Sequence, residues 1–366
     1  MERMLRTAET LYGPYRWGKY EVLVLPPSFP YGGMENPRLT FATPTAIAGD
    51  RSLVALIAHE MAHSWSGNLV TNATWRDFWL NEGFTTYIER RIVEEVFGKD
   101  LRAMEDVVQL QGLRKELTQL PKGDQALHLD LKDRDPDDAM TAVAYEKGAR
   151  FLMALEQAFG RERFDTFLRG YFDHFAFQSI TTADFESYLQ EKLFALDPQA
   201  AKKVSTHAWV HGANLPTIDP PPQSERLDHA AQLAKDWAGG KVDAKALQGQ
   251  SWVTLEWVHF LRSLPEKVPV AKLKELDDAH ELTARKNAEV AQAWLLKTIA
   301  NDYEPAQERL EGFLQSIGRR KYIVPLYEAL LKTPGGRERA RAIYEKARPH
   351  YHPIATETLD RLVLGK

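Results

Sequence analysis

Residues 56–65 read LIAHEMAHSW, and residues 79–84 read WLNEGF. His59 and His63 stand four residues apart, so on a helix they lie about 40° apart around the axis, on one face. One cation can therefore bind both imidazoles. Glu82 follows His63 after eighteen residues, which is long enough for a loop and the start of a second helix. Three protein ligands with one open coordination position are typical of a catalytic zinc site.

Glu60 stands beside the first histidine, where its carboxylate reaches a water on the cation without binding the cation. Such a group can act as a general base. The same four-residue pattern also arises by chance, because Glu and His are common on solvated helix faces. An apolar face on the same segment, a candidate N-cap at Asp50 and a candidate stop at Gly67 favour the metal-binding interpretation.

Glu89 lies seven residues after Glu82, on the same helical face. It can orient a histidine ligand by accepting a hydrogen bond. It can also pair with Arg90 or Arg91 in solvent, and the charge pattern favours this second interpretation.

Composition and charge place the chain among globular proteins. Its 366 residues, 44% hydrophobic and 27% charged, suffice for two or three domains with a large core. The net charge of −4 and the lack of a basic block argue against a nucleic-acid partner. No apolar run approaches the roughly 18 residues of a membrane span, and the first residues lack the apolar core of a signal peptide. The absence of cysteine excludes disulfides and fits a cytoplasmic protein.

The first half of the chain mixes short strands with helices. Residues 20–25 (YEVLVL) and 39–44 (LTFATP) are apolar and predict two strands. Residues 121–139 are polar, rich in Asp, and predict a loop. Apolar periodicity predicts helices at 3–12, 51–66, 77–97, 101–119, 142–159, 161–175 and 182–195, with Thr182 as the N-cap of the last.

A proline-rich linker at residues 213–223 separates this part from an all-helical remainder. We therefore expect a mixed α/β domain at 1–212 and an all-α domain at 224–366. Stacked antiparallel helix pairs, as in a solenoid, are the natural packing for the second domain. Its apolar stripes lie near 225–238, 252–264, 283–300, 310–317 and 337–347.

Residues 31–36, YGGMEN, form a second informative segment. Gly32 and Gly33 allow a substrate backbone to approach closely as an added strand. The Glu35 carboxylate would then lie beside the end of the bound chain, where it selects a free, cationic α-amine. An ordinary Pro/Gly turn with a solvated Glu35 explains the same residues, and the residues alone leave the two interpretations even.

Taken together, GGMEN, HExxH with Glu after eighteen residues, and AYEKG at 144–148 resemble the zinc aminopeptidases of the gluzincin class. The resemblance implies a thermolysin-like zinc domain, with a small sheet over metal-bearing helices, followed by a helical domain of the HEAT or armadillo kind. It covers nearly the whole chain. The pattern is most similar to the leukotriene A4 hydrolase and aminopeptidase B branch in LPPSFPYGGMENP (25–37), HSWSGNLVTN (63–72), FWLNEG (78–83), DPDDAMTAVAYEKG (135–148) and GRRKY (318–322).

The same resemblance implies a role for each matched position. It makes His59, His63 and Glu82 the ligands of one Zn²⁺ ion per chain and Glu60 the general base. Tyr145 would hydrogen-bond the developing oxyanion, a task that suits a phenol near a metal, although a lone tyrosine in a helix is more often packed core. The implied substrate-binding residues are Tyr31, Gly32, Gly33, Met34 and Glu35, which binds the free amine, with Asp137, Arg319 and Lys321.

Asp137 matches a carboxylate near the first side-chain pocket, which Tyr31, Phe78 and Pro136 would line. An acid there favours an N-terminal Arg or Lys. Arg319 and Lys321 would receive the C-terminal carboxylate of the substrate. Without the resemblance, these two residues predict only a solvated run of charge.

The chain departs from the family pattern in two respects. We expect that the large all-β domain that precedes the catalytic one in the family is absent, which would leave exposed strand edges and an open site. Met140 stands where the leukotriene enzyme has a second tyrosine, which disfavours epoxide chemistry. We expect an aminopeptidase that acts on short peptides with a free N-terminus. The alternatives are an epoxide hydrolase of the leukotriene A4 type and a truncated, non-catalytic binding module; the oligomeric state is not predicted.

Overall fold

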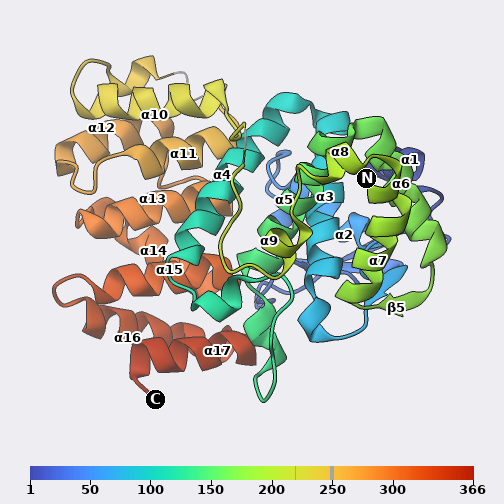
Figure 1. The fold of residues 1–366 in the computed structure, drawn as a ribbon. Helices are drawn as coiled ribbons and strands as arrows, with labels where there is room; N and C mark the ends of the chain where they lie inside the picture. Colours follow the sequence, from blue (N-terminus) through green and yellow to red (C-terminus); the bar gives the residue numbers. More distant parts are fainter. Residues whose placement is uncertain (219, 248–250) are drawn as a thin grey trace. The chain divides into compact units, whose positions relative to one another are not determined.

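The computed structural model describes residues 1–218, 220–247 and 251–366, apart from the side chain at position 138 (Figure 1). The described chain is mostly helical with little sheet. It forms two compact units. The first contains Met1–Glu21, Glu35–Thr40 and Ala55–Gln223, and the second contains Val22–Met34, Phe41–Val54 and Ser224–Lys366.

These units differ from the expected division in the segments at 22–34 and 41–54, which belong to the second unit rather than the first. Hydrogen bonds within that unit explain the difference. The N–H groups of Gly318 and Arg320 donate to the carbonyls of Pro27 and Pro30, at 2.8 and 3.0 Å. The expected linker at 213–223 ends the first unit, and its residue 219 lies outside the described residues.

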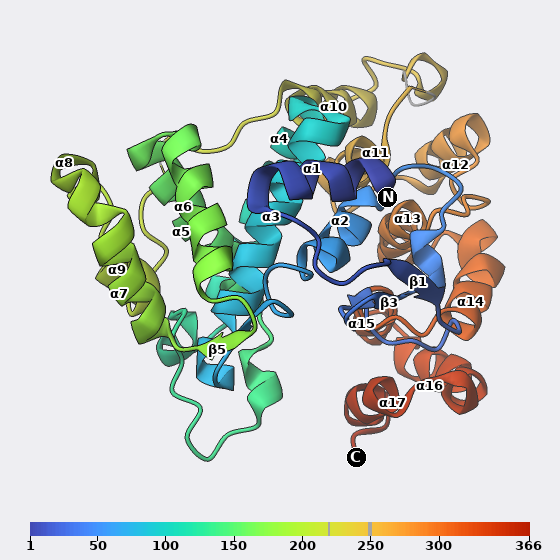
Figure 2. The same ribbon diagram turned by 90° about the vertical axis from the view of Figure 1, so that its right-hand side faces the viewer.

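Helix α3 (Trp79–Phe97) forms the core of the first unit. Every residue from Trp79 to Val93 is buried, as expected of a helix with neighbours on all sides. It packs against α1 (Glu2–Tyr12), α4 (Lys99–Leu117) and α5 (Gly148–Phe159) (Figure 2). This helix carries Glu82 and Glu89, so a buried helix supports the candidate site.

The helices of the first unit follow the apolar periodicity closely. Helices α1, α3 and α4 agree with the predictions within two residues, whereas the helix predicted at 142–159 is divided into a π-helical turn, η5 (Val143–Lys147), and α5. The capping residue of α7 differs, because Thr181, not Thr182, accepts the N–H of Asp184 and completes a capping box. The remaining helices are α6 (Arg161–His174), α7 (Thr182–Lys192), and the short α8 (Pro198–Ala201) and α9 (Thr206–Val210).

Helix α2 (Val54–Ala62) is shorter than the predicted 51–66. Asp50 is not its N-cap: its Oδ1 accepts the N–H of Ser52 at 2.9 Å in a turn before the helix. Gly67 has a φ of 100° and lies five residues beyond the helix end. The N–H of His63 still donates to the carbonyl of His59 at 3.2 Å, so the two histidines keep their helical spacing.

The predicted strands correspond to β1 (Glu21–Val24) and β3 (Leu39–Ala42). A third strand, β2 (Gly33–Met34), pairs antiparallel with β3, with Gly33 opposite Ala42, and the sheet order is β1-β3-β2. Strand β2 was not predicted because glycine weakens a strand pattern. A separate parallel pair joins β4 (Val70–Asn72) and β5 (Gln178–Ile180).

The C-terminal part of the second unit is a series of helices around a continuous apolar core, as the periodic stripes predicted. Helix α10 contacts α11, α11 contacts α13, and α13 contacts α15 (Figure 1, yellow to red). Pro325 lies inside α15, which explains why its pattern was not recognised. The helices are α10 (Glu225–Ala238), α11 (Thr254–Ser263), α12 (Val270–His280), α13 (Ala288–Ala300), α14 (Gln307–Ser316), α15 (Arg320–Leu331), α16 (Gly336–Ala347) and α17 (Pro353–Leu359).

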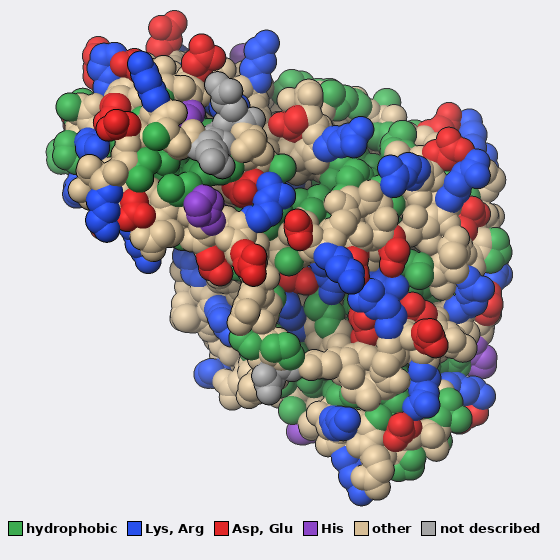
Figure 3. Space-filling view, turned by 90° about the horizontal axis from the view of Figure 1, so that it is seen from above, with side chains coloured by type: hydrophobic (Ala, Val, Ile, Leu, Met, Phe, Trp, Pro, Cys, Tyr) green, Lys and Arg blue, Asp and Glu red, His purple; other side chains and the backbone are tan. Residues whose placement is uncertain are grey.

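The surface mixes charges of both signs. Figure 3 shows Lys and Arg side chains interspersed with Asp and Glu over one face, so neither sign dominates there. Among the described residues, no helix combines the length and the apolar character needed to cross a bilayer.

Candidate metal centre and active site

His59, His63 and Glu82 come together in the first unit. Glu82 Oε2 lies 3.2 Å from His59 Nε2 and 3.6 Å from His63 Nε2. One donor atom from each of the three residues lies within 4.8 Å of the other two. Ligands about 2.1 Å from a tetrahedral ion are about 3.4 Å apart. The two measured separations therefore fit a zinc ion bound by these side chains.

The outer nitrogens of both histidines have hydrogen-bond partners. His59 Nδ1 donates to Glu89 Oε2 at 3.0 Å, and His63 Nδ1 donates to the carbonyl of Ser66 at 3.1 Å. Thr85 Oγ1 also lies 3.1 Å from His63 Nδ1. This arrangement leaves each Nε2 to bind a metal, and such outer contacts fix the orientation of metal-binding histidines.

The contact with Glu89 corrects the sequence interpretation that favoured a solvated pair with arginine. Glu89 is only 8% exposed and Arg90 only 1%, so neither lies in solvent. Glu89 does lie 3.5 Å from the Nε of Arg90, but this ion pair is inside the protein. Sequence reasoning missed Ser66 and Thr85, because a backbone carbonyl and a hydroxyl give no signal in a single sequence.

The electrostatics of the centre favour a bound cation. Burial opposes a charge on His59, but its hydrogen bonds to Glu82 and Glu89 outweigh burial and raise its pKa well above the ordinary value. Burial likewise opposes a charge on Glu82, yet the nearby His63 and His59 lower its pKa below the ordinary value. Two buried carboxylates thus stabilise a positive charge placed at the imidazoles.

Glu35 and Glu60 lie beside the centre. Their carboxylate oxygens and a ring nitrogen of His63 lie within 4.8 Å of one another. Glu60 is 5% exposed, whereas Glu35 is half-buried. Asn81 Nδ2 donates to Glu35 Oε1 at 3.4 Å, which fixes that carboxylate near His63. The carboxylates of Glu35 and Glu60 thus both lie beside His63, with Glu35 Oε1 4.0 Å from the outer nitrogen, Nδ1.

Tyr145 approaches the same centre from a π-helical turn, η5 (Val143–Lys147). Such turns occur often at functional sites. Its ring stacks on His59 with centroids 6.1 Å apart and meets the edge of Phe78 at 6.0 Å. Burial and the charge of Glu82 raise the pKa of Tyr145 well above its ordinary value, so the phenol keeps its proton for donation.

Two glycines allow Tyr145 to approach Glu82. A Cβ on Gly148 would lie 2.8 Å from the Cα of Gly83, and a Cβ on Gly83 would lie equally close to the Cα of Gly148. Real Cβ atoms essentially never approach that closely. The backbones of α3 and of the start of α5 therefore touch at this point, which explains the glycines of the NEG and YEKG motifs.

The other predicted substrate residues have different surroundings. Asp137 lies exposed in a short turn, Pro136–Ala139, and its N–H donates to Asp135 Oδ1 at 3.0 Å. Met140 is 42% exposed just after this turn. Tyr31, Gly32, Gly33 and Met34 belong to the second unit, where Gly33 and Met34 form the edge strand β2. Their roles stay predictions.

Arg319 and Lys321, also in the second unit, both make polar contacts, although the Lys321 side chain is 53% exposed. Lys321 Nζ lies 2.5 Å from Glu289 Oε1, and Arg319 Nη1 donates to the hydroxyl of Tyr322 at 3.2 Å. Arg319 is only 9% exposed. Tyr322 in turn donates to Glu289 Oε1 at 2.9 Å. Lys321 contacts the Glu289 carboxylate directly and Arg319 reaches it through the Tyr322 hydroxyl, so two cations share one carboxylate and the cluster keeps a net positive charge that suits an anionic group.

Comparison with known proteins identifies the family. Residues 1–209 match the model of the peptidase family M1 domain, and residues 252–363 match the C-terminal domain of leukotriene A4 hydrolase. The chain belongs to peptidase family M1. The resemblance inferred from the motifs is thereby confirmed, and zinc, the cofactor expected from the donor set, is the metal of this family.

Relatives match the chain over nearly its full length. Leucine aminopeptidase 2 of Ajellomyces capsulatus is 37% identical over all of the chain and 60% of its own length. Aminopeptidase B of Mus musculus is 38% identical over 94% of the chain and 55% of its own length. The chain thus spans little more than half of these relatives.

A solved structure supports the same relationship. Yeast leukotriene A4 hydrolase, in complex with bestatin, aligns with a TM-score of 0.91 at 32% sequence identity. The alignment covers 99% of this chain and 62% of the yeast protein.

Proposed function

We propose that the chain is a zinc aminopeptidase that removes N-terminal residues from short peptides. One observation carries the proposal: the spacing of His59, His63 and Glu82 fits a zinc ion, and the carboxylates of Glu35 and Glu60 lie beside His63. Relatives named leucine aminopeptidase and aminopeptidase B support it. A bound zinc ion supplies a Lewis acid that polarises the peptide carbonyl and lowers the pKa of water to about 7.

The side chains of the first unit perform the remaining steps. Glu35 binds the free α-amine and so fixes the first peptide bond at the centre. Glu60 removes a proton from the attacking water and then delivers it to the leaving amine. Tyr145 donates its phenolic hydrogen bond to the oxygen that becomes negative in the transition state. Glu89 and the carbonyl of Ser66 hold the two imidazoles in place.

Substrate selection follows from the remaining residues. Strand β2 is an edge strand, so a peptide backbone can add to it beside Tyr31, Gly32, Gly33 and Met34. Asp137 selects an N-terminal Arg or Lys. The net positive cluster of Arg319 and Lys321 receives the C-terminal carboxylate, which favours short peptides.

We also infer that α10 to α17 stack as a solenoid of the HEAT or armadillo kind. The order of their contacts supports this packing. We further propose that the catalytic domain spans 1–212 and that the protein acts in the cytoplasm, which its cysteine-free composition suits.

Hydrolysis of an allylic epoxide is the second candidate. The similarity to yeast leukotriene A4 hydrolase favours it. Met140 disfavours it, because a thioether offers no hydroxyl where the leukotriene enzyme has a tyrosine. Incubation with an allylic fatty-acid epoxide decides the question: only non-enzymatic diols would dismiss this activity.

Release of a chromophore from Arg, Lys, Ala and Leu anilides tests the main proposal. We expect cleavage that a chelator abolishes and zinc restores. Glu60→Gln should retain zinc and lose on the order of 10²–10⁴ in rate. Glu162→Gln, at an exposed position on α6, is the matched control and should retain full activity. Cleavage insensitive to the chelator would exclude the zinc mechanism, and no cleavage at all would favour a binding module.

A further inference from the structure

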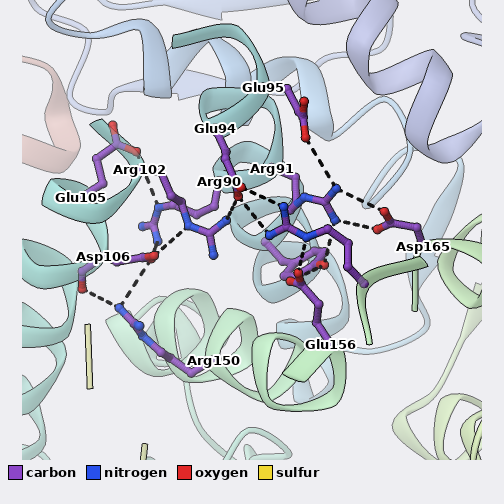
Figure 4. Close-up of polar contacts among 12 residues, drawn as sticks. Arg90, Arg91, Glu94, Glu95, Arg102, Glu105, Asp106, Arg150, Glu156 and Asp165 are labelled. Atoms are coloured by element: carbon purple, nitrogen blue, oxygen red, sulfur yellow. Dashed lines mark hydrogen bonds and ion pairs between the residues drawn. The ribbon is translucent and has the colours of Figure 1, made fainter. Parts of the chain in front are cut away.

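Arg90 lies at the centre of a buried group of charges in the first unit (Figure 4). The side chain is 1% exposed. Its Nη2 donates to Glu146 Oε1 at 2.8 Å, and its Nη1 donates to Asp106 Oδ1 at 3.3 Å. Its Nε lies 3.5 Å from Glu89 Oε1 and 3.8 Å from Glu105 Oε2. One guanidinium therefore forms ion pairs with four carboxylates, which belong to three separate elements.

One branch of this group leads to the metal centre. Glu89 places Oε2 on His59 Nδ1 and Oε1 near Arg90 Nε. The carboxylate thus has a hydrogen bond to His59 at one oxygen and an ion pair with Arg90 at the other, since Arg90 Nε makes no hydrogen bond among the described residues. Loss of the guanidinium would leave Glu89 with a single partner in a buried environment, free to rotate away from the histidine ring.

The other branch leads to Tyr145. Glu146 is the next residue in the π-helical turn, and Arg90 is its nearest cationic partner at 2.8 Å. Successive side chains in a helical turn point in directions that are set by the rotation of the turn about its axis. A contact that fixes the Glu146 side chain therefore also fixes the direction of its neighbour, Tyr145. That rotation determines where the Tyr145 hydroxyl lies relative to Glu82.

We propose that Arg90 is a positioning residue. It fixes the orientation of His59 through Glu89 and the position of Tyr145 through Glu146. The inference rests on the proposed function and adds a residue that touches neither metal nor substrate. The planar fork of arginine reaches Glu89 and Glu146 at once. The ammonium group of lysine presents a point charge and cannot reproduce that geometry.

Arg91 provides a matched comparison on the same helix. It is equally buried and makes two hydrogen bonds to Asp165, from Nη1 at 2.6 Å and from Nη2 at 3.2 Å (Figure 4). Its partner lies on α6, and it contacts neither Glu89 nor Glu146 among its described contacts. Replacing Arg91 therefore removes a comparable buried ion pair, with Asp165, that has no contact with the metal centre.

The test compares Arg90→Lys with Arg91→Lys in the full chain. Zinc affinity is measured by competition with a chromogenic chelator, and kcat and KM are measured on an arginine anilide. We expect Arg90→Lys to weaken zinc binding about 10–100-fold and to lower kcat with little change in KM. Arg91→Lys should lower the melting temperature comparably and leave zinc affinity within about threefold. Equal zinc affinity and kcat in Arg90→Lys and the wild type would overturn the inference.

Two milder variants test each branch if Arg90→Lys does not fold. Glu89→Gln should weaken zinc binding, whereas Glu146→Gln should lower kcat and leave zinc affinity unchanged. Identical effects of the two variants would also overturn the inference. If the wild-type chain binds zinc and cleaves anilides, the proposed function stands whatever the variants show. If the wild-type chain does neither, both the proposed function and the inference about Arg90 are wrong.

Discussion

Replacing Gly148 by alanine should separate the two segments that carry Glu82 and Tyr145. The new Cβ would lie 2.8 Å from the Cα of Gly83 and 3.6 Å from its nitrogen. Non-bonded carbons pack best at about 3.5–4.0 Å. The backbones must therefore separate by about 1 Å, because neither contact atom is the end of a flexible side chain.

The expected cost follows from that displacement. Overpacking a core costs about 1–3 kcal/mol, which exceeds the ~0.5–1 kcal/mol that alanine gains over glycine inside a helix. A displacement of about 1 Å at the reacting groups can cost on the order of 10²-fold in rate. We expect Gly148→Ala to unfold at lower urea concentration and to lose kcat far more than it raises KM.

Gly112→Ala is the matched control for Gly148→Ala. Gly112 lies within α4, and a Cβ there would have no atom within 4 Å. The control should gain up to about 1 kcal/mol in stability and retain full kcat. Urea unfolding and anilide kinetics measure both quantities. If Gly148→Ala matches the control in stability and kcat, the reasoning from close backbone contact is wrong.

Three further outcomes follow from single side chains. Tyr145→Phe should retain zinc but lose about 10²–10³ in kcat, since it removes an oxyanion donor; unchanged kcat would contradict that role. Burial, aided by Glu89, raises the pKa of Glu105 from 4.5 to about 8. Because the folded pKa is the higher one, the stability that Glu105 contributes is complete below pH 4.5 and declines as the pH rises through the folded pKa. Glu105→Gln should abolish this decline in urea unfolding, and an unaltered pH profile would refute it. Thr181→Ala should cost about 1 kcal/mol through loss of the α7 cap, and a melting temperature equal to the wild type would contradict it.

Much of the fold could be predicted because helix formation depends on local periodicity. The stripes at 225–238 and 337–347 correspond closely to α10 and α16. Helix α15 was not recognised because Pro325 interrupts its pattern. The segments at 22–34 and 41–54 belong to the second unit through contacts with residues far along the chain. Local pattern carries no information on such pairings.

In the candidate site, too, local spacing could be predicted from the sequence and tertiary contacts could not. The spacing of His59 and His63 specifies one helical face, so their proximity could be predicted from geometry. The burial of Arg90 could not, because a run of Glu and Arg looks like a solvated surface in sequence. Its burial depends on carboxylates from α4 and η5, and these approach only in the folded unit. The pairing of Gly83 with Gly148 depends likewise on tertiary packing.

Anomalous diffraction at the zinc edge tests the central claim most directly. Crystals of the zinc-loaded chain should show a peak about 2.0–2.2 Å from His59 Nε2, His63 Nε2 and a Glu82 carboxylate oxygen. The same crystals of His63→Ala should lose that peak. A map without density between these three side chains, or with the metal bound by other residues, would contradict the account.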